Sequence, residues 1–228
     1  MKYVTFLLFV LLTPLQAKEV SFFLVRHGET EWNRLKRVQG HTDMPLNNTG
    51  RAQAREAAEK LVQAHLDITS VYASDLSRAQ ETAKETATKL NVPIFSSKAL
   101  RERCAGISEG FTYDEWFAHY KDAFDRLEKE FSCREERWAQ RVVPESETLA
   151  ESYARMKEEL TRIANASFDG EKVAVFAHKR VITVFAAGIS GQEYEAINVP
   201  NCGMLEVHYN SETTPPFHLV TKSSQSQQ

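Results

Sequence analysis

The sequence predicts an α/β protein with a mainly parallel central sheet. Two observations predict this class. Short apolar runs, typical of buried strands, alternate with longer segments whose apolar residues recur every three or four positions. The alternation continues along the chain of 228 residues without an internal repeat or an interior linker, so we expect one folded domain.

Five runs have the length and composition of strands. They are residues 20–25, 68–73, 173–177, 204–209 and 217–221. The first run, VSFFLV, and the third, VAVFA, are continuously apolar, as expected for strands that are buried on both faces.

Helices are predicted where cap signals precede apolar residues at helical spacing. The loop signal at 47–50 precedes a helix that runs through Val62, and Ser74-Asp75 opens one that runs to about Leu90. Two capping boxes, T-x-x-E at 112–115 and 148–151, start two more helices. An apolar helix is also predicted over residues 181–189.

An aromatic stripe follows the first capping box. It comprises Phe117, Tyr120, Phe124, Leu127 and Phe131, at steps of three and four residues. We expect this stripe to pack in the protein core rather than to form a ligand-binding lid.

Residues 1–17 have the pattern of a secretory signal peptide. Lys2 is followed by an apolar run at 3–12, and cleavage is expected after Ala17. The run is shorter than the roughly 20 apolar residues of a membrane-spanning helix. We therefore expect a secreted or periplasmic protein with no membrane contact after signal removal; the alternative is a membrane anchor formed by an uncleaved N-terminus. The folded domain would then span 18–222, followed by a disordered polar tail at 223–228.

Charge and cysteine content exclude several classes. A net charge of -3 argues against a general nucleic-acid binder. Cys104, Cys133 and Cys202 are too few for a disulfide scaffold and form no C-x-x-C pair, so no structural zinc site is expected. One disulfide with one free thiol, or three unpaired thiols, both stay open. No acidic metal cluster is visible, no metal or cofactor is predicted, and the oligomeric state is left open.

Basic and histidine side chains follow three predicted strands. Arg26-His27-Gly28 ends the first strand, His178 ends the strand at 173–177, and Arg78 lies one turn beyond the strand at 68–73. The carboxyl ends of parallel strands share one sheet edge, where ligands bind. Arginine forks match phosphate oxygens, Gly28 lets the backbone approach an anion, and a neutral imidazole can attack phosphorus. The sequence has no P-loop motif.

These segments resemble the histidine phosphatase superfamily, also called the phosphoglycerate mutase-like family. The extended match LVRHGETEWN at 24–33 is the most specific. Four further matches follow in the family's order: GHTDMPL at 40–46, VYASDLSRAQETA at 71–83, LRE at 100–102 and VAVFAHKRVI at 173–182. The resemblance covers about residues 20–209. It implies a three-layer α/β/α fold and an insertion at 110–144 that forms a lid, with Trp116, Tyr120 and Trp138 as candidate lining residues.

The resemblance also implies roles for individual residues. His27 would be the nucleophile that forms a phosphohistidine, and Glu102 would be the general acid and base. Arg26, Arg78 and His178 would hold the phosphoryl oxygens. The residues implied to contact the substrate are Gly28, Asn33, Gln39, Gly40, Arg103 and Lys179. The substrate would be a small phosphorylated molecule, cleaved without a metal.

Two features depart from the family pattern. The second histidine is followed by Lys179-Arg180, where the family usually has Gly or another small residue. The insertion also lacks a clear arginine pair of the kind that holds the substrate carboxylate in phosphoglycerate mutases. The missing arginine pair, together with the expected export, favours a phosphatase of phosphomonoesters over a mutase. Lys179 either points away from the pocket or narrows it and changes the substrate preference. The alternatives are a phosphoglycerate mutase, a protein phosphatase of the same family and a phosphate-binding pseudoenzyme.

Overall fold

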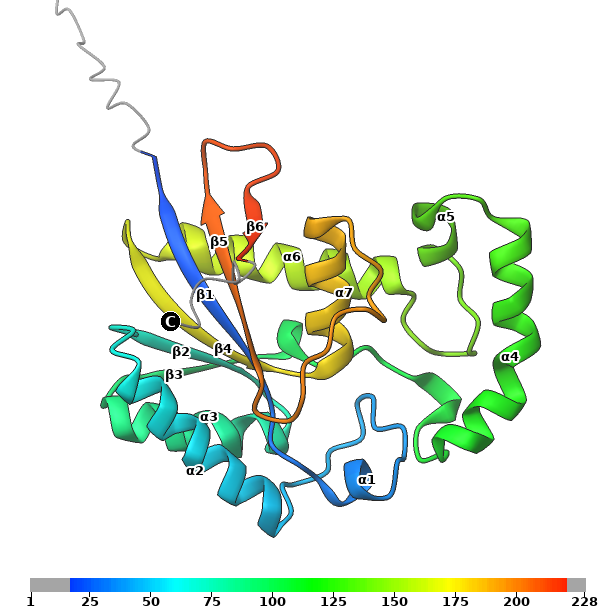
Figure 1. Cartoon of the computed structure of the whole chain (residues 1–228), viewed down its shortest axis with the longest axis horizontal. Helices are drawn as coiled ribbons and strands as arrows, with labels where there is room; N and C mark the ends of the chain where they lie inside the picture. The colour runs from blue at the N-terminus through cyan, green and yellow to red at the C-terminus, as the bar shows by residue number, and fades with distance from the viewer. Residues whose placement is uncertain (1–16, 221–228) are drawn as a thin grey trace, which may run out of the picture.

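The computed structural model describes residues 17–220 and contains one six-stranded sheet with helices on both faces (Figure 1). The strand order is β3-β2-β4-β1-β5-β6. Their bounds are β1 Glu19–Arg26, β2 Ser70–Ser74, β3 Ile94–Ser97, β4 Glu171–Ala177, β5 Met204–Asn210 and β6 Phe217–Leu219. The β1–β4, β4–β2 and β2–β3 pairs are parallel, whereas β5 and β6 pair in antiparallel fashion. The sheet is therefore mainly parallel, which confirms the predicted class.

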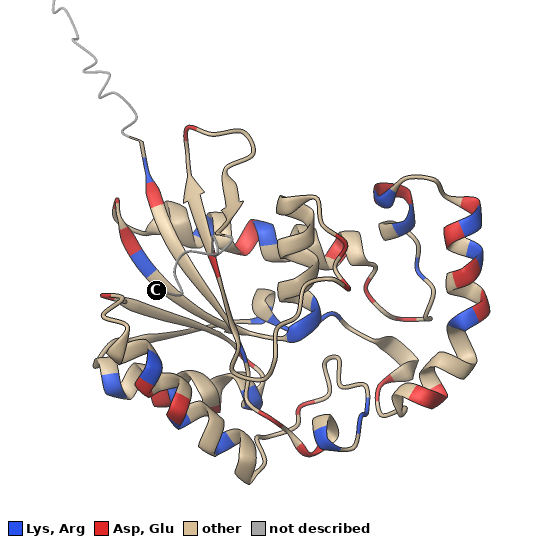
Figure 2. Cartoon of the chain, viewed as in Figure 1, with Lys and Arg blue, Asp and Glu red and all other residues tan. Residues whose placement is uncertain are grey.

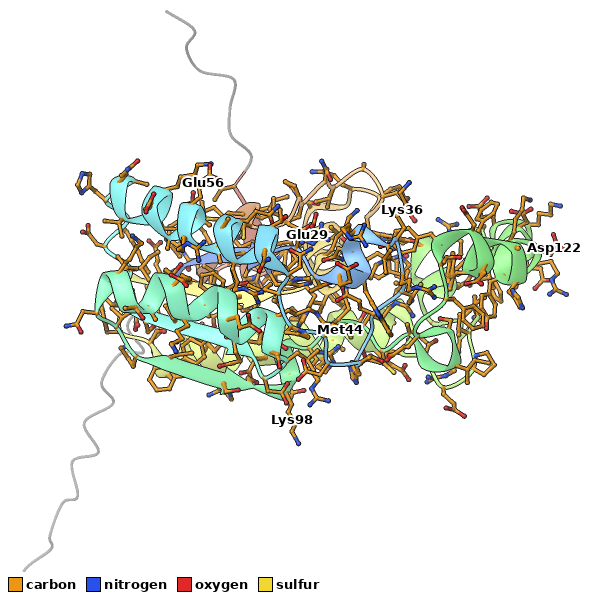
Figure 3. The ribbon with its side chains drawn as sticks, turned by 90° about the horizontal axis from the view of Figure 1, so that it is seen from below. Glu29, Lys36, Met44, Glu56, Lys98 and Asp122 are labelled. Carbon is orange, nitrogen blue, oxygen red and sulfur yellow. The ribbon has the colours of Figure 1, made fainter. Side chains whose placement is uncertain are left out.

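Helices cover both faces of this sheet, and α4 lies to one side of it (Figure 1). The longer ones are α2 Asn48–Gln63, α3 Ser77–Leu90, α4 Tyr113–Glu130, α6 Leu149–Ala166 and α7 Lys179–Ser190. The short ones are α1 Glu31–Arg34, α5 Arg134–Trp138 and the 3-10 turns η1 Lys98–Leu100 and η2 Gly106–Ser108. Figure 3 shows α2 and α3 side by side on one face, with Glu56 on α2 and Asp122 on α4 near opposite ends of the molecule. Helices α6 and α7 cover the other face.

The alternation of side chains along β1 separates two cores. Phe22 and Leu24 face the cluster that includes residues of α6 and α7, whereas Phe23 and Val25 face the cluster that includes residues of α2 and α3. All four side chains are buried. A strand with both faces buried needs a continuous apolar run, which is why VSFFLV is a reliable strand signal.

Strand β3 and helix α1 are among the short elements that were not predicted. Strand β3 has only four residues, and its Phe95 is 45% exposed because β3 lies at the edge of the sheet. Helix α1 is a single turn whose Thr30 and Asn33 form a reciprocal cap. Neither segment is long enough to show a period in the sequence.

The expectation that the aromatic stripe packs in the core is wrong. Both predicted capping boxes are present, but α4 buries none of its residues, and Phe117 is 56% exposed. The reason is position: α4 lies at one side of the sheet instead of on either face (Figure 1). Trp116, Phe124 and Leu127 of α4 line a small pocket together with Val143 and Tyr194.

Several expectations concern the chain ends, the cysteines and the membrane. The signal peptide at 1–17 lies outside the described residues except for Ala17, and the tail at 223–228 lies outside them entirely. Cys104, Cys133 and Cys202 are all free thiols. Within 17–220, none of the helices combines the length and apolar character that a bilayer crossing requires.

Phe185 on α7 tests the larger of the two cores. Its ring is fully buried, stacks on Tyr153 at 6.0 Å and meets the edge of Phe217 at 5.4 Å. Phe185→Ala is expected to lower the free energy of unfolding by about 3–5 kcal/mol, because it leaves a cavity that the packed neighbours cannot fill. Urea denaturation measures the loss.

The matched control is Phe168→Ala, since Phe168 is 59% exposed. Its loss should stay within about 0.5 kcal/mol. Equal losses for the two variants would contradict the assignment of Phe185 to the core.

Candidate active site

A cavity of about 480 Å³ opens at the carboxyl ends of β1 and β4. It lies where the sheet edge, the loop after β1, the segment after η1 and the start of α4 meet. Its lining comprises Arg26, His27, Asn33, Arg37, Val38, Gln39, Gly40, Arg78, Glu102, Arg103, Ala105, Tyr113, Asp114, Trp116, Phe117, Lys179 and Arg180. Residues more than 150 positions apart in the chain therefore share one hollow.

His27 is held as a neutral imidazole with one nitrogen available. Its Nδ1 lies 2.7 Å from the Gly28 carbonyl oxygen, which can only accept a hydrogen bond, so Nδ1 carries the proton and Nε2 keeps its lone pair. The ring is 3% exposed. Burial, with the positive charges of Arg78 and Arg26 added to it, holds the pKa of His27 well below its usual range. An imidazole in this state can act as a nucleophile.

His178 lies beside His27 because β4 pairs in parallel with β1. Arg26 is in register with Ala177, and the two imidazole centroids are 5.1 Å apart. Arg78 Nε donates to His178 Nδ1 at 3.1 Å, so in the neutral ring the proton is on Nε2. Burial and the Arg78 charge lower the pKa of His178 well below its usual range. His178 Nε2 is thus a hydrogen-bond donor next to the nucleophile.

Arg78 is fully buried on the first turn of α3. Besides its bond to His178, Nη1 donates to the Thr42 carbonyl at 2.9 Å and Nη2 to the Gly40 carbonyl at 2.8 Å. Burial lowers the pKa of Arg78 to about 10, so the group stays charged at neutral pH. The remaining guanidinium N–H groups are free to hold an anion in the cavity.

Three buried donors at this site have no hydrogen-bond partner within residues 17–220. They are Arg26 Nε, Arg103 Nε and His178 Nε2. Arg26 and Arg103 line the cavity, and His178 packs beside His27 with the two ring centroids 5.1 Å apart. Buried donors are almost always paired, so unpaired donors at and next to one cavity indicate a ligand with several acceptor oxygens. Phosphate fits this requirement.

Backbone N–H groups clamp the Glu102 carboxyl at the cavity wall. Oε1 accepts from the N–H groups of Arg103 and Val181, at 2.8 and 3.0 Å, and Oε2 accepts from that of Arg180 at 3.1 Å. Oε2 therefore keeps a free lone pair. An acid or base held in this way is positioned to exchange a proton with a group bound in the cavity.

The structure brings most of the predicted site residues together but not all. Asn33, Gln39, Gly40, Arg103 and Lys179 line the cavity along with His27, Glu102, Arg26 and Arg78. Gly28 and His178 are not among the lining residues, although the His178 ring centroid lies 5.1 Å from that of His27. A Cβ on Gly28 would lie 2.5 Å from the Gly50 carbonyl oxygen, and its N–H donates to Thr82. Glycine is needed at 28 for packing against α2.

Of the three candidate lid residues, Trp116 alone lines the cavity. Tyr120 is not among the lining residues, and Trp138 is 7% exposed in the core, where its ring packs near Tyr153 and Tyr194. The expectation that Tyr120 and Trp138 line the cavity is therefore wrong. Phe117 lines the cavity instead and was assigned to the core from its spacing.

Sequence reasoning also missed the residues that position the site. Glu109 accepts from the N–H groups of His41 and Thr42, both at 2.8 Å, and so shapes the loop that binds Arg78. Arg155 pairs with Glu147 at 2.7 Å and donates to three carbonyls at 99–102, which holds the segment that carries Glu102. The only sequence signal for Arg155 is a charged residue beside the apolar stripe of α6.

A metal site finds no support in the geometry. Among residues 17–220, no three His, Cys, Asp or Glu side chains are grouped closely enough to hold an ion. Cationic and neutral donors supply the electrostatic surroundings of the cavity instead.

Comparisons with known proteins agree with this geometry. The sequence profile of the histidine phosphatase superfamily (branch 1) matches residues 22–219. The chain is 32% identical over 191 residues to the uncharacterized phosphatase PhoE of Bacillus subtilis, covering 83% of this chain and 88% of PhoE. It is 30% identical over 201 residues to the probable phosphoglycerate mutase GpmB of Photorhabdus laumondii, covering 83% and 85%.

The fold has solved counterparts as well. A phosphoserine phosphatase mutant of Entamoeba histolytica, solved in complex with phosphoserine, superposes with a TM-score of 0.69 at 25% identity, covering 89% of this chain and 95% of that one. The profile match spans both histidines, both arginines and Glu102. The chain therefore belongs to branch 1 of the histidine phosphatase superfamily.

Proposed function

We propose that this protein is a metal-independent phosphatase that hydrolyses phosphomonoesters of small molecules through a phosphohistidine on His27. One observation carries the proposal: a neutral imidazole with a free Nε2 lies near buried donors that lack partners within residues 17–220. Phosphoryl transfer needs little beyond this, because positioning and charge stabilisation supply most of the catalysis.

The reaction has two steps. His27 Nε2 attacks phosphorus, the bond to the ester oxygen breaks, and Glu102 gives that oxygen a proton. Water then attacks the phosphohistidine, Glu102 takes a proton from it, and phosphate and neutral His27 are released. Arg26, Arg78 and His178 Nε2 hold the phosphoryl oxygens throughout.

Hydrolysis is favoured over mutase activity by the insertion. Arg134 donates to the Ala187 carbonyl, Arg137 to the Phe131 and Ser132 carbonyls, and Arg141 pairs with Glu151. None of these arginines lines the cavity that contains His27. A mutase must retain its product for rephosphorylation, and the insertion supplies no arginine for that purpose. Phosphatase PhoE, similar over most of the chain, is consistent with hydrolysis.

We also propose that the mature protein is exported. The support is the sequence pattern of residues 1–17, with Lys2 ahead of the apolar run. The natural substrate would then be a phosphomonoester outside the cytoplasm. The folded domain is proposed to span 18–222, with residues 110–144, including α4 and α5, acting as a lid beside the cavity.

His27→Ala tests the nucleophile. With p-nitrophenyl phosphate and EDTA present, the parent should turn over and the variant should lose activity to background, because Nε2 of the neighbouring His178 carries a proton and cannot replace His27 as the nucleophile. His208→Ala, at a 52% exposed ring, is the matched control and should retain activity. Equal activity of His27→Ala and the parent would sink the phosphohistidine mechanism, as would failure to trap an acid-labile phosphoenzyme.

Glu102→Gln tests the general acid. The substitution keeps the size of the side chain but removes the transferable proton, so kcat should fall by about 10²–10⁴-fold for an alkyl phosphate. The loss should be much smaller for p-nitrophenyl phosphate, whose leaving group needs little protonation. Glu158→Gln, at an exposed position of α6, is the control. A loss that is the same for both substrates would argue against proton donation by Glu102.

The acid limb of the pH profile of kcat/KM should report the protonation of His27. Because its pKa is depressed, the imidazole stays neutral as pH falls through 6.5 and becomes protonated only below that range. Removing the Arg26 charge should raise this pKa, so the acid limb of kcat/KM for Arg26→Gln should move to higher pH than in the parent. An NMR titration of His27 should shift in the same direction; an unchanged limb and titration would contradict the charge argument.

A further inference from the structure

Three basic side chains beside the cavity are not needed to hold the transferring phosphoryl group. They are Arg103, which follows Glu102, and Lys179 and Arg180, which begin α7. We call them the leaving-side cluster. All three line the cavity. Figure 2 shows the basic start of α7 in the middle of the molecule, between the sheet and α4 in this view.

The cavity carries more positive charge than one phosphate requires. Its cationic lining residues are Arg26, Arg37, Arg78, Arg103, Lys179 and Arg180, and its acidic ones are Glu102 and Asp114. None of the six cations belongs to a salt bridge in the described part of the chain. A phosphomonoester brings about two negative charges. About two positive charges are then still uncompensated.

The surplus lies on the side of the cavity that would hold the leaving group. Glu102, which must reach the leaving oxygen, is clamped by the backbone N–H groups of Arg103 and Arg180. The two residues that hold the acid therefore also carry two of the surplus charges. Their backbone nitrogens lie 2.8 and 3.1 Å from the Glu102 carboxylate oxygens, so their side chains start close to the acid.

Neighbouring groups hold the arginine side chains of the leaving-side cluster in place. Arg103 donates through Nη1 to the Glu147 carbonyl at 2.8 Å, while its buried Nε has no partner in the described chain. The Arg180 guanidinium is held 4.8 Å above the Tyr194 ring. Burial and the neighbouring Arg180 charge lower the pKa of Arg103, and burial and the Arg26 charge lower that of Lys179. Like charges held together in this way are stabilised by an anion.

We propose that the leaving-side cluster binds a second anionic group on the leaving alcohol, so that the enzyme prefers phosphomonoesters that carry a carboxylate or a second phosphate. This rests on the proposed phosphatase function and adds the substrate class. Lys179 and Arg180 are the specificity-determining residues, at positions where the family usually has small ones. Trp116 and Phe117 form an apolar wall of the same cavity, which suits an aromatic or otherwise apolar carbon skeleton next to the anion.

Three aryl esters test the preference. They are 3-carboxyphenyl, 3-carbamoylphenyl and 3-phosphonophenyl phosphate; the carbamoyl ester is a neutral match for the carboxyl ester. The parent enzyme should show a kcat/KM for an anionic ester about tenfold or more above that for the carbamoyl ester, mostly through KM. The kcat/KM of the carboxyl ester and that of the phosphono ester are each divided by that of the carbamoyl ester. The larger of these two ratios tells whether the site prefers a carboxylate or a second phosphate.

Substitutions then assign the preference to the cluster. In Lys179→Gln/Arg180→Gln, which keeps the backbone N–H of Arg180 for Glu102, the ratio should fall to within about twofold of one. Lys179→Arg should keep it, because the charge is retained. Lys84→Gln, at an exposed position of α3, is the control and should leave the ratio unchanged. Binding of the carboxyl and carbamoyl esters to His27→Ala gives the same comparison without turnover.

The outcomes separate this inference from the proposed function. If the parent cleaves none of the three esters, the phosphatase function itself is wrong. Comparable kcat/KM values for all three esters would contradict the binding of a second anionic group, but they would leave the proposed phosphatase function standing. A preference that survives in the double variant would also overturn the assignment to Lys179 and Arg180.

Discussion

The buried guanidinium of Arg78 is the interaction on which the rest of the site depends. It joins three parts of the chain: its own helix α3, the loop that carries Gly40 and Thr42, and His178 at the end of β4. A fully buried charge is costly unless its donors are satisfied, so the loop must offer two carbonyls and the imidazole its Nδ1. This fixes the His178 tautomer and, through the charge, helps to keep His27 neutral. Arg78 therefore contributes both to the packing of the fold and to the neutral state of the nucleophile His27.

Backbone constraints around Arg78 explain why the loops have so little freedom. Gly40 adopts a positive φ of 54°, and a Cβ there would lie 2.0 Å from Glu109 Oε1. The same Glu109 carboxylate accepts from the backbone just beyond Gly40. On the other side, Arg155 holds the carbonyls that precede and include Glu102. Two buried ion and hydrogen-bond networks thus bring the acid and the phosphate-binding loop to the same cavity.

The sequence predicted those parts of the protein whose signals are local. Continuous apolar runs gave β1 and β4, and capping boxes located α4 and α6 to within a residue. A parallel sheet places the carboxyl ends of these strands at one edge, which is how His27 and His178 could be placed near each other; that β1 and β4 are direct neighbours is known only from the structure. Arg155 and Glu109 could not be found in this way, because the backbone groups that they hold at the site lie 53 or more residues away. The burial of α4 was mispredicted for a similar reason: an apolar stripe shows which side of a helix is apolar but not what faces it.

Charge distribution explains how one chain can be acidic overall and still attract phosphate esters. The net charge of the sequence is -3, yet six cations converge on a cavity with two acids. On α4, acidic and basic residues alternate along the outer surface (Figure 2), so their fields largely cancel. Four of the six cavity cations are instead buried or half-buried, where screening by salt is weaker: Arg26, Arg37, Arg78 and Arg103. The positive potential is therefore concentrated in the cavity at the sheet edge, so an anion is attracted more strongly there than elsewhere on the surface. Because the cations repel one another in the free protein, an anion that compensates them also stabilises the fold, and binding and stability become linked.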